Sequence, residues 1–97
     1  MPKGYVIFTE AINDPEGMKA YAKAAAPATG ANGVRVLAAD PGPEVLEGTW
    51  HGDQTVILEF ESVEAAHAWY NSADYSKAKP LRQAAADTNV AIVSGLG

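Results

Sequence analysis

Arg82 and Tyr75 are the residues whose types and spacing best suit ligand binding. They lie seven positions apart, with Ala78 between them, so a helix would place them broadly on one face. A guanidinium on a partly apolar face must be paired when it is buried, and its planar fork matches the two oxygens of a carboxylate. We therefore predict that Arg82 anchors an acidic ligand. The alternatives are an internal ion pair with Glu47 or Glu59, or a solvated side chain.

Two carboxylates and one histidine are candidates for proton transfer. Glu59 lies in an apolar run, and Glu47 ends a short extended run. A carboxylate in a low-dielectric environment has a raised pKa and could act as a general base. His51 follows Trp50 in a glycine-flanked loop and could exchange protons near neutral pH. The alternatives are salt bridges or solvent-facing positions for the carboxylates, and a hairpin tip or an interface contact for the loop residues.

Aromatic side chains could form the walls of a pocket between sheet and helices, although in so small a chain most of them would also serve as core. The predicted ligand-binding residues are Arg82, Tyr75, Trp69, Tyr21, Glu47 and Trp50, and the predicted proton-transfer residues are Glu59 and His51.

Composition excludes several classes of site. The chain of 97 residues has no cysteine, which excludes disulfides and thiolate ligands and fits a reducing cytoplasm. Its two histidines, His51 and His67, are far apart and show no metal-ligand spacing, so we expect neither metal nor cofactor. The net charge is −5 without a basic cluster, which argues against nucleic acid. No apolar run is long enough to cross a membrane, and no secretory signal is visible, so we expect a cytoplasmic protein.

Four runs have the composition of strands, and three segments between them have helical character. We expect strands at 5–12, 34–38, 54–60 and 90–96, with a short ribbon at 44–47. The first helix should begin at Pro15 after a capping Asp14, and the others should follow the capping residues Ser62 and Ser72. Pro27 should kink or end the first helix, and residues 87–89 should end the third.

The strands predict a second copy of the chain. An antiparallel sheet with one wet face should alternate apolar and polar residues, yet the runs 6–8, 56–58 and 90–93 are apolar at neighbouring positions. The helices can cover only one face of the sheet. We therefore expect one α+β domain over residues 1–97, with helices on one face of an antiparallel sheet, that forms a homodimer through the other face.

The order and spacing of several short motifs resemble the bacterial family called domain of unknown function 1330, in the dimeric α/β-barrel superfamily. The motifs are Gly4-Tyr5-Val6-Ile7, Asp14-Pro15-Glu16 with Tyr21, residues 43–48, 57–60, 68–70 and 74–75, and Leu81-Arg82. The resemblance implies a ferredoxin-like protomer whose sheet stacks on that of its twin. It implies no reaction. Two hypotheses remain. The first is a protein that binds a small acidic or aromatic molecule between sheet and helices, with or without cofactor-independent catalysis, and the second is a non-catalytic dimerisation or accessory module.

Overall fold

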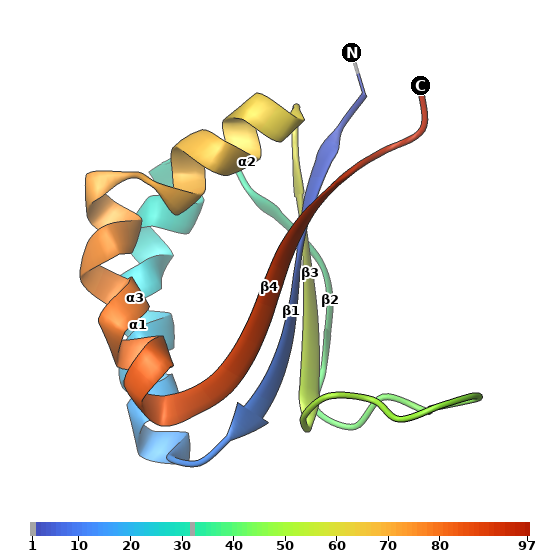
Figure 1. The fold of residues 1–97 in the computed structure, drawn as a ribbon. Coiled ribbons are helices and arrows are strands. Elements are labelled where there is room, and N and C mark those ends of the chain that lie inside the picture. The colour runs from blue at the N-terminus through green and yellow to red at the C-terminus, as the bar shows by residue number, and fades with distance from the viewer. Residues whose placement is uncertain (1, 32) are drawn as a thin grey trace.

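A computed structural model describes residues 2–31 and 33–97, and within them the chain forms one four-stranded sheet and three helices (Figure 1). The elements are β1 (Gly4–Ile12), α1 (Pro15–Ala31), β2 (Arg35–Asp40), β3 (Gln54–Phe60), α2 (Val63–Tyr70), α3 (Ala73–Ala85) and β4 (Ala86–Ser94).

The sheet has the strand order β2-β3-β1-β4, and every neighbouring pair is antiparallel. All three helices lie on one side of it, as Figure 1 shows. This arrangement confirms the predicted ferredoxin-like α+β fold. The two faces of the sheet therefore have different surroundings, because the helices cover only one of them.

Local capping explains where α2 and α3 begin. The Ser62 hydroxyl accepts a hydrogen bond from the Ala65 amide at 3.0 Å, and the Ser72 hydroxyl accepts one from the Tyr75 amide at 3.1 Å. Each serine thus satisfies one of the free amides in the first helical turn. Both caps were predicted from the sequence and are confirmed.

Three predicted boundaries differ from the structure. The first helix does not end at Pro27, one of the two outcomes expected there, but runs through it to Ala31, with Ala25 and Ala28 buried on either side of the proline. The last strand begins at Ala86, because residues 86–89 already pair with β1. The ribbon expected at 44–47 is not formed, since residues 41–53 between β2 and β3 are irregular.

Alternation along β1 separates the two faces of the sheet. Val6, Phe8 and Glu10 point towards the helices and are buried, whereas Ile7 between them is only partly covered. The helix-facing side carries the hydrophobic core, in which Trp69 and Tyr75 are among the largest fully buried side chains. The opposite side is open in a single chain.

Candidate functional site

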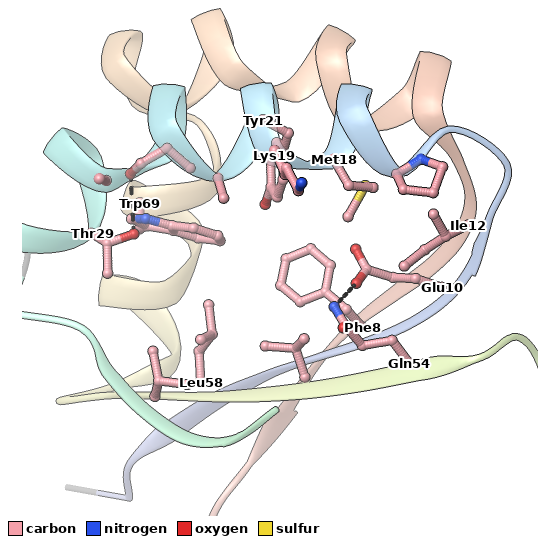
Figure 2. A pocket seen from close by; sticks show the side chains of 16 residues that line it. Phe8, Glu10, Ile12, Met18, Lys19, Tyr21, Thr29, Gln54, Leu58 and Trp69 are labelled. Atoms are coloured by element: carbon pink, nitrogen blue, oxygen red, sulfur yellow. Dashed lines mark hydrogen bonds between the residues drawn. The ribbon is translucent and has the colours of Figure 1, made fainter. Parts of the chain in front are cut away.

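A pocket of about 520 Å³ lies between α1 and the sheet (Figure 2). Most of its wall is apolar, with contributions from α1, β1, β3 and α2. The main apolar residues are Phe8, Met18, Ala25, Val56, Leu58 and Trp69. Glu10 and Gln54 lie at one end of the pocket, and Trp69 and Thr29 lie at the other. The site therefore combines an apolar body with a polar end.

Glu10 is the carboxylate at this polar end, and only 2% of it is exposed. Gln54 Nε2 donates a hydrogen bond to its Oε1 at 3.0 Å, while Oε2 has no partner among the described residues. Loss of hydration raises the pKa of Glu10, and the hydrogen bond from Gln54 and the charge of Arg82 oppose this shift. The carboxyl group is thereby suited to hold or accept a proton inside the pocket.

Sequence reasoning did not select Glu10. The available signal was its position in β1, two residues after Phe8 and four after Val6, which places the three side chains on one face of a strand.

Tyr21 on α1 lines the pocket, and Tyr75 on α3 contacts Tyr21. Their hydroxyl oxygens are 2.8 Å apart, and their rings meet edge to face. Burial raises the pKa of both phenols, so both are neutral at physiological pH. Trp69 stacks against Tyr75 with ring centroids 4.1 Å apart. The structure thus brings together three of the predicted ligand-binding residues.

Arg82 is buried beside this cluster but does not line the α1 pocket. Its guanidinium lies 5.4 Å from the centroid of the Phe8 ring. Desolvation alone would lower the pKa of Arg82, but its interactions with Tyr75 and Tyr21 raise it, so the side chain keeps its charge. Arg82 instead lines a separate, polar pocket of about 400 Å³ between α3 and β4.

The predicted proton-transfer residues lie on the other face of the sheet. Glu59 Oε1 is 3.5 Å from Arg35 Nη1, and Glu59 Oε2 accepts a hydrogen bond from the Tyr5 hydroxyl at 3.3 Å. His51 Nδ1 is 2.9 Å from Thr9 Oγ1 on the same face. Neither side chain is near Arg82 or the α1 pocket, and Glu59 does not pair with Arg82.

Glu47 and Trp50 belong to the irregular segment 41–53, where they line a separate hollow of about 300 Å³. Trp50 is about half exposed and donates from Nε1 to Thr55 Oγ1 at 2.8 Å. The structure therefore does not place these two predicted ligand-binding residues with Tyr21, Trp69 and Tyr75.

Within residues 2–31 and 33–97, no helix has the length and apolar character needed to cross a bilayer. This part of the chain also contains no group of three or more histidine, aspartate or glutamate side chains placed to hold a metal ion.

Comparison with protein families places nearly the whole sequence in one group. The model of the family described as "Domain of unknown function (DUF1330)" matches residues 3–96. No curated protein matches the chain.

Solved structures share the fold at low sequence identity. RPA0582, a protein of unknown function from Rhodopseudomonas palustris, is 22% identical with a TM-score of 0.78, over 99% of this chain and 84% of its own. A dimeric ferredoxin-like protein of unknown function from Thermobifida fusca is 16% identical with a TM-score of 0.66, and the match covers 96% of this chain and 91% of that protein. A protein from Caulobacter crescentus, proposed to be an antibiotic biosynthesis monooxygenase, is 14% identical with a TM-score of 0.64, and the match covers 99% of this chain and 92% of that protein.

Proposed function

The chain belongs to the DUF1330 family, which is defined without an activity, and we propose that it is a homodimer that binds a small, largely apolar molecule in the α1 pocket. The observation that carries the proposal is an apolar pocket with one buried carboxyl group at its end. Ligand sites are typically cavities of this kind, of roughly 300–1,000 Å³, in which a few polar groups orient an apolar ligand. The pocket's volume of about 520 Å³ suits a molecule with one or two rings.

The polar end of the pocket favours a neutral ligand over an acid. The sequence suggested an acidic or aromatic molecule, but an acid in the α1 pocket would face the carboxyl group of Glu10. When protonated, Glu10 can donate to a carbonyl or hydroxyl oxygen, and when ionised it can accept from a hydroxyl or amide. Gln54 holds one of its oxygens in place. We therefore assign a neutral aromatic molecule with one hydrogen-bonding group to this site.

Glu10 would also be the proton-transfer group if the bound molecule is turned over. It is the carboxyl group that lines the α1 pocket, whereas Glu59 and His51 lie on the opposite face of the sheet. A cofactor-independent reaction that begins with removal of a proton from the ligand fits this arrangement. A non-catalytic binding protein would need the same pocket but no turnover.

A second copy of the chain would cover the open face of the sheet. Ile7 lies between Ile57 and Ala91 in register on this face, so apolar side chains form its centre. The segment 41–53 projects on the same side (Figure 1) and exposes Leu46 almost fully. A contiguous apolar surface of this kind favours association, and the Thermobifida fusca structure is described as dimeric.

The test is a thermal-shift and NMR screen with benzamide and benzyl alcohol as neutral probes and benzoate as the charged one. Ala22 on α1 lines the pocket and is exposed, so Ala22→Phe should fill it without disturbing the core. Ala20→Phe is the matched control, because Ala20 is exposed on the same helix outside the pocket. We expect the neutral probes to bind the wild type and Ala20→Phe, but not Ala22→Phe.

Replacement of the carboxyl group tests the ligand class. Glu10→Gln keeps the size of the side chain and an oxygen for the hydrogen bond from Gln54. We expect it to reduce the preference for benzamide over benzoate in the α1 pocket. If no neutral aromatic probe binds, or if the probes bind Ala22→Phe and Ala20→Phe equally, the non-catalytic dimerisation module is the better interpretation.

A further inference from the structure

We propose that the protein has a second ligand site, for a small monocarboxylate, in the polar pocket between α3 and β4, where Arg82 and Thr88 bind the carboxylate. This pocket shares no lining residue with the α1 pocket. Its walls are the end of α2 at Tyr70, the last turns of α3 at Arg82 and Gln83, and the first part of β4 at residues 86–88 and 90. The inference does not depend on the function proposed for the α1 pocket.

The guanidinium of Arg82 forms no ion pair within the described parts of the chain, although its charge acts on Glu10 and its side chain interacts with Tyr75. Arg82 is only 2% exposed, and no carboxylate of residues 2–31 or 33–97 lies within ion-pair distance of it. Its Nε has no hydrogen-bond partner among those residues. A buried charge normally requires an opposite charge and satisfied hydrogen bonds, and Arg82 remains charged at every physiological pH. An anionic ligand could therefore form the ion pair that Arg82 does not make within the described residues.

Thr88 supplies a second unpaired group at the same pocket. Its Oγ1 is buried and has no hydrogen-bond partner within the described parts of the chain. Buried hydroxyls almost always have a partner, so one without a partner indicates an absent ligand or an ordered water. Arg82 comes from the last turn of α3 and Thr88 from the strand that follows it directly. Two unpaired polar groups, on two adjacent elements, therefore border one cavity.

The charges around the pocket select the type of anion. Asp87 borders the pocket, but its side chain points to the opposite face of β4, where its carboxylate lies 3.5 Å from His51 Nε2. Glu10 pairs with Thr88 in the β1–β4 register and places an acidic group near the pocket. This group would repel a dianion more than a monoanion. The fork of a guanidinium accommodates the two oxygens of a carboxylate, so a monocarboxylate fits better than phosphate.

The experiment is a titration of the full chain with acetate, propionate and phosphate at constant ionic strength, followed by NMR shifts of β4 and by calorimetry. Thr88→Val removes the hydroxyl with little change in shape, and Arg82→Lys keeps the charge but removes the fork. Lys77→Gln is the control, because Lys77 is exposed on the same helix and the change removes one positive charge.

We expect saturable binding of the carboxylates, weakened by about tenfold in Arg82→Lys and several-fold in Thr88→Val, and unchanged in Lys77→Gln. Ala22→Phe, which fills the α1 pocket, should retain this binding. The proposal is overturned if binding of acetate and propionate does not saturate, or if phosphate binds more tightly than they do. It is also overturned if Thr88→Val binds the carboxylates as tightly as the wild type does, or if Ala22→Phe abolishes their binding. If Arg82→Lys does not fold, Thr88→Val still tests the site.

Discussion

The hydroxyl oxygens of Tyr21 and Tyr75 lie 2.8 Å apart and join α1 to α3 on the helix-facing side of the sheet. Tyr75 is fully buried, while Tyr21 lines the α1 pocket. The hydrogen bond therefore fixes one wall of the candidate site to the core of the protein. It also connects the α1 pocket to the neighbourhood of Arg82, which interacts with Tyr75.

Tyr21→Phe should lower the free energy of unfolding by about 1–3 kcal/mol, because it leaves the buried hydroxyl of Tyr75 without this partner. Urea unfolding at a fixed protein concentration measures the change. Tyr70→Phe is the matched control, since the Tyr70 hydroxyl has no hydrogen bond within the described residues. We expect it to change stability by less than about 0.5 kcal/mol. Equal losses in the two variants would show that the contact between the hydroxyls contributes little.

The buried carboxyl group of Glu10 should make stability depend on pH in a defined direction. Burial raises its pKa in the native state above the reference value of 4.5, so the folded chain holds a proton that the unfolded chain has released. Unfolding then releases a proton between the two pKa values. The free energy of unfolding should therefore fall as the pH rises from about 4.5 through the native pKa, and level off above it.

Glu10→Gln isolates this contribution because it cannot ionise. The stability of the variant relative to the wild type should increase across the same pH range and stay constant above it, as measured by urea unfolding between about pH 4 and 8. A difference that does not vary with pH, or that decreases as the pH rises, would mean that Glu10 is not desolvated in the native state.

The elements that could be predicted from the sequence are those that depend on local chemistry. Ser62 and Ser72 cap α2 and α3 through bonds to residues three positions away, so the signal lies within a few residues of each helix start. The spacing of Arg82 and Tyr75 likewise follows from helix geometry alone, and both are buried on the inner side of α3. The order of strands and helices along the chain sufficed for the fold class.

The residues that could not be predicted depend on long-range pairing. Glu10 and Glu59 both lie in apolar runs, and each could face either side of its strand. The helices cover the face that Glu10 shares with Val6, while Glu59 lies opposite Tyr5 on the other face. The side that the helices cover is set by the packing of the whole chain. The early start of β4 also depends on long-range pairing, because the polar residues 87–89 adopt a strand conformation by pairing with β1.

A charge on the open face of the sheet should separate the proposed dimer. Ile57 lies at its centre, opposite Ile7 in register. Light scattering of the wild type should give about twice the chain mass of 10.1 kDa. Ile57→Arg should give the mass of a single chain, because an unpaired guanidinium would otherwise be buried between two sheets. Leu81→Arg, at an exposed position on α3, is the control and should leave the mass unchanged. A wild-type mass of one chain at micromolar concentration would rule out the stable dimer.

Gly52 and Gly48 form a matched pair for testing how the segment before β3 supports Glu10. Both have positive φ, +80° and +79°, so alanine is strained at either position. A Cβ at position 52 would also collide with the backbone carbonyl of Glu10, whereas none of the described atoms lies near one at position 48. The Asp53 amide donates to the same carbonyl at 2.7 Å, which holds the two segments together.

Gly48→Ala should therefore lower the free energy of unfolding by about 1–2 kcal/mol, from backbone strain alone. Gly52→Ala should cost clearly more, about 3 kcal/mol or above, because either β1 or the segment before β3 must move. Since that movement displaces Glu10, Gly52→Ala should also weaken binding of benzamide in the α1 pocket, and Gly48→Ala should not. Urea unfolding and the NMR titration give the two readings on the same samples. Equal stability losses with unchanged benzamide binding would show that the close approach of Gly52 does not position the carboxyl group.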